Sequence, residues 1–188
     1  MHRLIGLILC LFSASYTSNN WLYTVDRNVD ATPLNSSEAI YVSNIGLYDS
    51  QTASTVNQNL WAHIQNIGSF EKNRTEALDS KDFVEVKVIS IDSLQFCLFQ
   101  LNKPFDTLVY TGNFKRDVFQ TDRICELIPF YPIFFRKRIK TGTFYMDHES
   151  KFRLNSKSWS DGLVLLIFGG DGGGSMKTNY QIITNPID

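Results

Sequence analysis

The feature that most constrains the fold is a succession of short runs rich in β-branched and aromatic residues, with turn signals between them. No helix-length window keeps the apolar spacing of an amphipathic helix. The pattern predicts an all-β fold, an antiparallel β-sandwich of the jelly-roll type, with a barrel as the alternative. The runs span residues 40–42, 60–64, 83–89, 96–101, 107–110, 130–139, 143–146, 152–154, 163–168 and 180–184, and the turn signals lie at 102–104, 111–113, 140–142 and 160–162.

The size and composition of the chain fit one globular domain. It has 188 residues, of which 43% are hydrophobic and 20% are charged. That length suffices for one substantial core. We divide the chain into a signal peptide at 1–15, an N-terminal arm or opening strand at 16–38, and a single domain at 39–188.

The first residues have the features of a secretory leader. Met1-His2-Arg3 is basic, residues 4–12 are apolar, and small residues follow up to Ser15. This order predicts a signal peptide, cleavage after Ser15 and a secreted, extracellular protein. A membrane-spanning helix needs about twenty apolar residues. Since no later stretch is longer than the first, we expect no membrane span.

The charge balance gives no reason to expect a nucleic-acid partner. The chain has 18 basic and 19 acidic residues and a formal charge of −1, and removal of a leader containing Arg3 makes it more negative. Phosphate backbones are bound by an excess of Lys and Arg. We therefore expect no nucleic acid among the partners.

Cysteines and sequons agree with the secretory route. After the leader, Cys97 and Cys125 remain. In an oxidising compartment an even pair is most simply one disulfide, and the alternative is a reactive thiol, which would need a nearby base. Asn35 and Asn73 begin Asn-x-Ser/Thr sequons in polar stretches, where N-glycans are expected.

A glycine-rich stretch, residues 169–174, invites comparison with a phosphate-binding loop. A P-loop ends in Gly-Lys-Ser/Thr before a helix. Here Met176 precedes Lys177, and the sequence that follows is typical of a strand. We interpret 169–174 as a hairpin turn and expect no nucleotide.

No set of catalytic residues emerges. His63 lies in a predicted strand, where it is expected to have one ring nitrogen satisfied, and His148 lies in a turn; neither belongs to a zinc motif. Ser175 lacks the motif of a serine hydrolase. A carboxylate pair for glycoside cleavage assembles in space, and the sequence selects no pair.

A basic cluster comprises Arg136, Lys137, Arg138 and Lys140. It is a candidate contact for an anionic partner such as a sulfated glycan. The interpretation that we favour is structural: an exposed or edge strand in which charge prevents aggregation next to the apolar run at 130–135.

From residue 40 to 185 the order of features resembles a CUB domain, an extracellular β-sandwich. Residues 57–64 look like its Asn-x-x-Cys-x-Trp-x-Ile strand without the cysteine, and 83–91 like its next apolar strand. Cys97 and Cys125 have spacing similar to its second disulfide. Residues 162–171 and 180–183 resemble its last two strands. The first family disulfide is absent, 69–82 reads as an insertion, and 130–160 is long, so a divergent CUB-like lineage fits better.

Some CUB domains bind calcium through three acids, and the resemblance transfers these positions to Asp92, Gln100 and Asp171. It implies that the three come together in space. Because Gln100 offers only a neutral amide oxygen, calcium would be bound weakly or lost. An alternative for Asp171 is a turn-favouring role among the glycines.

The main hypothesis is a secreted, glycosylated module that recognises an extracellular protein or glycan through sandwich loops, as the resemblance implies. The first alternative is a secreted hydrolase that uses carboxylates on the same loops. A lesser alternative is a secreted host-defence effector. An enzyme should show a committed nucleophile, base or metal set, and the sequence shows none, so a binding role is favoured.

Overall fold

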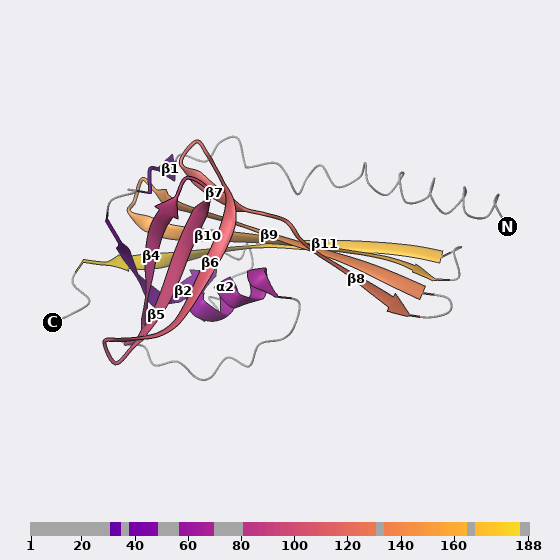
Figure 1. Ribbon diagram of the computed structural model, residues 1–188, viewed down its shortest axis with the longest axis horizontal. Helices are drawn as coiled ribbons and strands as arrows, with labels where there is room; N and C mark the ends of the chain where they lie inside the picture. The colour runs from indigo at the N-terminus through magenta and orange to yellow at the C-terminus, as the bar shows by residue number, and fades with distance from the viewer. Residues whose placement is uncertain are drawn as a thin grey trace.

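The computed structural model describes residues 31–34, 38–48, 57–69, 81–130, 134–164 and 168–184. Nearly all of them form antiparallel strands (Figure 1). The elements are β1 (Ala31–Thr32), β2 (Ile40–Tyr48), β3 (Asn57–Asn59), α2 (Leu60–Gly68), β4 (Phe83–Ser90), β5 (Ser93–Gln100), β6 (Lys103–Lys115), β7 (Val118–Thr121), β8 (Ile124–Phe130), β9 (Phe134–Asp147), β10 (Lys151–Val164) and β11 (Phe168–Ile183).

The strands form one sheet whose two ends meet. In chain order, β2, β4, β5, β6, β7, β9, β10 and β11 each pair with the next, and β11 returns to β2. The pairing of Phe119 in β7 with Phe144 in β9 closes the ring. The all-β, antiparallel prediction is confirmed. The sandwich form is not, because these strands make an up-and-down barrel from a single sheet.

The three longest strands continue beyond the barrel. Figure 1 shows β8 to β11 running together away from it as a ribbon. We call this extension the arm: β8 with residues 134–140 of β9, 158–164 of β10 and 168–174 of β11, which pair side by side. Within the described residues, the strands of the arm pair only with one another.

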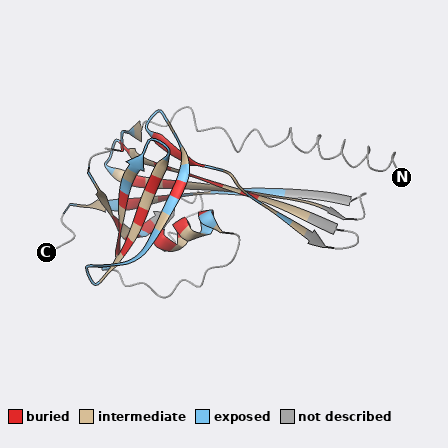
Figure 2. Ribbon diagram, in the orientation of Figure 1, coloured by how far each residue is buried: buried red, intermediate tan, exposed pale blue. Residues whose placement is uncertain are grey.

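The core lies inside the barrel, where the buried residues of the strands gather (Figure 2). Aromatic rings of several strands contact one another there. The β5 pattern shows why: Leu94, Phe96 and Leu98 alternate with less buried residues and point to one face. Small barrels are filled by side chains and not by solvent. The largest fully buried side chains include Tyr180, Phe96, Phe119, Phe144 and Phe152.

The predicted strand at 60–64 is wrong, because these residues begin helix α2. A short apolar run does not distinguish a strand from a buried helix. Two signals favoured the helix: Asn59, whose side chain accepts a hydrogen bond from the Ala62 amide at 2.9 Å, and apolar residues that continue to Ile67 at helical spacing. The helix packs its apolar face onto the barrel core.

Four predicted turns lie inside strands, and at two of them glycine allows close packing instead of chain reversal. An added Cβ at Gly112 would stand 2.1 Å from the backbone oxygen of Gln120, so only glycine lets β6 approach β7 so closely. At Gly142 it would stand 2.8 Å from Ile67 of α2. The stretch 160–162 lies within β10, and 169–174 lies within β11.

Several predictions fall outside the described residues. These are the signal peptide at 1–15, most of the N-terminal arm or opening strand at 16–38, and the sequons at Asn35 and Asn73. Of the expected N-terminal arm, β1 is described and pairs with Met146 and Asp147 of β9. Among the described residues, no helix is both long and apolar enough to cross a membrane.

Candidate functional site

Helix α2 is fixed to the barrel at both ends by polar side chains. At its start, the Trp61 amide donates a hydrogen bond to Oδ1 of Asn44 in β2 at 2.9 Å, which adds to the Asn59 cap. Further along, the Tyr110 hydroxyl of β6 donates to the Ile64 carbonyl at 2.7 Å. The first two bonds satisfy amides that the start of a helix leaves unpaired, and the third joins the helix to β6.

His63 points from α2 into the wall of the barrel. Its Nε2 lies 2.8 Å from the Ser156 hydroxyl of β10, and its Nδ1 lies 3.2 Å from the Tyr180 hydroxyl of β11. Because a hydroxyl can donate or accept, both ring nitrogens are satisfied in either tautomer. Burial lowers the pKa of His63 to about 4. His63 is therefore a neutral helix residue, and not the strand residue that was expected.

Lys140 of β9 holds the other end of the helix. Its ammonium donates to the carbonyls of Asn66 and Ser69, each at 2.7 Å. A cation there satisfies orphan carbonyls and interacts favourably with the helix dipole. Burial lowers the pKa of Lys140, and the charge of Arg138 lowers it further while Glu126 opposes.

Replacement of Lys140 by methionine should lower the free energy of unfolding by about 1–2 kcal/mol, because two charge-assisted hydrogen bonds are lost while the aliphatic stem is kept. Urea unfolding measures this difference. The matched control is Lys87→Met. Lys87 is an exposed residue of β4, so its replacement should change stability little. Equal effects in the two variants would contradict a capping role for Lys140.

One face of the arm carries basic side chains, serine hydroxyls and the exposed backbone of glycines. Strand alternation places Arg136, Arg138 and Lys140 of β9 on this face. In register with Arg138 and Lys140 stand Ser160 and Ser158 of β10, and next to these serines stand Gly172 and Gly174 of β11. Ser156 is the next serine on the same face of β10. We call this face, from His63 to Arg136, the polar groove.

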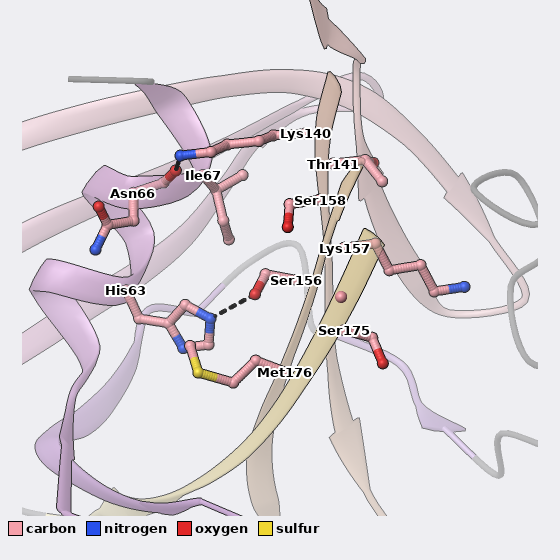
Figure 3. A pocket seen from close by; sticks show the side chains of 11 residues that line it. His63, Asn66, Ile67, Lys140, Thr141, Ser156, Lys157, Ser158, Ser175 and Met176 are labelled. Carbon is pink, nitrogen blue, oxygen red and sulfur yellow. Dashed lines mark hydrogen bonds between the residues drawn. The ribbon is translucent and has the colours of Figure 1, made fainter. Parts of the chain in front are cut away.

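The polar groove is hollow along its length. An open hollow of about 350 Å³ lies between α2 and the strands, and a second of about 340 Å³ continues it along the arm. Lys140, Ser158 and Gly174 line both hollows. Nothing lies within 4 Å of where a Cβ would stand on Gly174, so the floor is exposed backbone. In Figure 3, the side chain of Ser158 points into the hollow, whereas those of Lys157 and Ser175, which also line it, point away.

Of the structural interpretation of the basic cluster as an exposed or edge strand, the edge position is wrong. β9 lies between β8 and β10 in the arm. Arg136 Nε donates to the Ser160 hydroxyl at 2.6 Å, and Arg138 stands 3.6 Å from Glu126. Lys137 belongs to the opposite face of the strand. Three cations and one acid therefore share the groove face, which carries positive charge.

The three calcium candidates do not converge. Asp92 precedes β5 and Gln100 ends it, which separates them by roughly 26 Å of extended strand. Asp92 accepts hydrogen bonds from Ser90 and Ser93 and organises the β4–β5 turn. Asp171 pairs in register with Asp161, and its side chain lies outside the described residues. The described part of the chain holds no cluster of three or more metal-ligating side chains.

The expected disulfide is not formed. Cys97 and Cys125 are free thiols, Cys97 half-buried and Cys125 exposed. The reason is the strand order: Cys97 lies on β5 between β4 and β6, whereas Cys125 lies on β8, which pairs with β9. The Thr107 hydroxyl donates to the Cys97 sulfur at 3.5 Å.

The polar groove was missed because its signal was divided between two segments. Serine recurs at alternate positions from 156 to 160, and glycine at alternate positions from 170 to 174. In a strand, alternate residues share one face. Recognition of this period would have predicted a serine stripe and a glycine stripe, but not that they are neighbours.

Comparison with known proteins gives no relative: no family model, no curated protein and no solved structure matches the chain. Interpretation of the site therefore depends on its own geometry.

Proposed function

We propose that this protein is a secreted binding module that recognises an acidic glycan in the polar groove. The observation that carries the proposal is the side-by-side arrangement of a basic stripe, a serine stripe and a glycine stripe on one face of the arm. The sequence predicted that sandwich loops bind the partner, whereas the groove proposed here lies on strands of the arm. The CUB-like lineage remains a prediction.

The chemistry of the groove suits a sulfated or carboxylated sugar. Serine hydroxyls donate and accept hydrogen bonds, as sugar hydroxyls do, and guanidinium groups bind sulfate or carboxylate oxygens through two donors. The bare floor at Gly172 and Gly174 admits a ring close to the backbone. Ile67 and Met176 add apolar surface next to His63 for the less polar face of a sugar.

The shape of the groove favours an extended ligand. Small-molecule pockets usually enclose most of their ligand. Here two open hollows continue into each other through shared residues. A chain of sugar units can lie along such a groove and contact both hollows. Because charge provides part of the attraction, the affinity should fall as salt is added.

The test uses a heparin oligosaccharide and its desulfated counterpart in calorimetric titrations. We expect the sulfated probe to bind and Gly174→Val to weaken binding about tenfold, because a branched side chain then fills the floor and removes contacts of the order of a charged hydrogen bond. Since nothing lies near a Cβ at Gly174 and valine suits strands, the fold should tolerate the change.

The matched control is Ser175→Val, which introduces the same side chain one residue further on the same strand, on the face that points away from the hollow (Figure 3). It should leave affinity unchanged. Equal affinity for the sulfated and desulfated probes, or equal loss in both variants, would refute a glycan site in the groove.

A further inference from the structure

His63 and Ser156 form a pair although 93 positions separate them in the sequence. Helix α2 carries the histidine and β10 the serine, and His63 Nε2 lies 2.8 Å from the Ser156 hydroxyl (Figure 3). On the other side of the ring, the Tyr180 hydroxyl lies 3.2 Å from Nδ1. A hydroxyl, an imidazole within hydrogen-bond reach and a third group that orients the imidazole are the parts of an activated nucleophile.

The pair stands at the boundary between the core and the hollow beside α2. His63 is 3% exposed, whereas Ser156 is half-buried, and both line the open hollow of about 350 Å³. The imidazole is therefore sheltered from water, while the serine borders a space that a small molecule can enter. A serine that only satisfied a buried histidine would serve equally well if it were fully buried.

The two hydrogen bonds define the arrangement of protons that a reaction needs. When Nδ1 carries the ring proton and donates a hydrogen bond to Tyr180, the lone pair of Nε2 faces Ser156 and can accept the serine proton. Burial lowers the pKa of His63 to about 4, so the ring is neutral at pH 7, which is the form that a base requires. Burial also raises the pKa of Tyr180, so this partner stays a neutral hydroxyl.

We propose that Ser156 is the nucleophile of a serine esterase that cleaves esters of short acyl chains, with His63 as its general base. This activity goes beyond the binding function proposed above and does not depend on it. Ile67 and Met176 also line the hollow and offer apolar contact to a short acyl chain (Figure 3). Lys140 brings positive charge to the same hollow, where negative charge develops on the carbonyl oxygen of the ester.

The reaction has two steps, and each returns the proton that it takes. In the first, the Ser156 Oγ bonds to the carbonyl carbon while its proton moves to His63 Nε2. The bond between this carbon and the alcohol oxygen then breaks, and the alcohol leaves with the proton from His63. In the second, water attacks the acyl-serine with His63 as base, which releases a carboxylic acid and restores Ser156.

The group behind the imidazole limits the expected rate. In a serine protease this group is a carboxylate, and its replacement by an amide lowers kcat about 10⁴-fold. Here the group is the Tyr180 hydroxyl, and none of the described residues that line the hollow is acidic. We therefore expect slow turnover, which is best detected with an activated ester and with a covalent probe.

The experiment treats the protein with a fluorophosphonate probe, which forms a bond to an activated serine and releases fluoride. Peptide mapping should place the adduct on Ser156, and Ser156→Ala should lose it. His63→Gln should slow labelling about 100-fold, at the lower end of the contribution of a general base. The matched control is Ser175→Ala: Ser175 lines the same hollow but its hydroxyl points away, so labelling should be unchanged (Figure 3).

Cleavage of p-nitrophenyl acetate gives a second readout. The unaltered protein should release p-nitrophenolate, and Ser156→Ala should lose this activity. Circular dichroism and thermal melting verify that each variant folds. Since glutamine keeps hydrogen-bonding groups toward Ser156 and Tyr180, slow labelling of a folded His63→Gln variant would identify proton transfer, and not packing, as the role of the imidazole.

The proposal would be overturned by an adduct on a residue other than Ser156, by equal labelling rates in His63→Gln and the unaltered protein, or by unchanged ester cleavage in Ser156→Ala. The glycan site is tested separately, because labelling needs no oligosaccharide. Labelling without oligosaccharide binding would refute only the glycan site. Oligosaccharide binding without labelling would refute only the esterase.

Discussion

Replacement of Phe144 by alanine should lower the free energy of unfolding by about 3–5 kcal/mol, the cost of a buried aromatic ring and the cavity it leaves. Phe144 is fully buried, and its backbone pairs with Phe119 where the barrel closes. Its ring centroid lies 4.8 Å from that of Phe96 and 6.2 Å from those of Tyr110 and Phe152. The substitution therefore removes contacts from several strands at the closure of the sheet.

Denaturant unfolding measures the loss, and Phe105→Ala provides the control. Phe105 is 61% exposed on β6, so its truncation should change stability by less than about 1 kcal/mol. If Phe144→Ala were no more destabilising than Phe105→Ala, the aromatic cluster would not form the core and the closed barrel would be wrong.

The stability of the protein should fall between pH 6.5 and pH 4 because of His63, by an amount that approaches about 3 kcal/mol. Burial lowers the pKa of this imidazole from 6.5 to about 4. In that window the unfolded chain binds a proton that the folded chain does not. The contribution of neutral His63 is thus complete above pH 6.5 and is lost as the pH falls toward 4.

Unfolding at a series of pH values tests this expectation, with His63→Gln as the comparison. Glutamine keeps hydrogen-bonding groups toward Ser156 and Tyr180 but does not titrate, so its stability should vary less across the window. The carboxyl of Asp147 has a lowered pKa despite burial, because Lys151 and Arg153 donate hydrogen bonds to it. The stability that this carboxylate contributes is therefore lost only below its ordinary pKa of 3.8. Equal slopes in the two proteins between pH 6.5 and 4.5 would contradict the role of His63.

Strand content was predictable because it depends on local pattern. The alternation from residue 83 to 89 and the β-branched run at 180–184 correspond to β4 and the end of β11. In contrast, helix α2 was missed because its first five residues suit a strand as well as a helix, and packing of Ile64 and Ile67 against the barrel decided the outcome.

Glycine positions were misread for a related reason. Glycine favours turns when it is judged by backbone freedom alone. At Gly112 and Gly142 the deciding factor is the neighbour that a side chain would meet, which belongs to β7 or to α2. Such a contact exists only after the strands and the helix have assembled.

The sequence by itself determined the class of fold, because side-chain alternation and β-propensity act over a few neighbouring residues. The tertiary structure alone decided that the sheet closes into a barrel, that Asp92 and Gln100 stand at opposite ends of β5, and that Cys97 and Cys125 lie on strands that are not neighbours. It also placed the serines of β10 between the cations of β9 and the glycines of β11. Strand order and register fix these relations, and both arise from contacts between residues far apart in the chain.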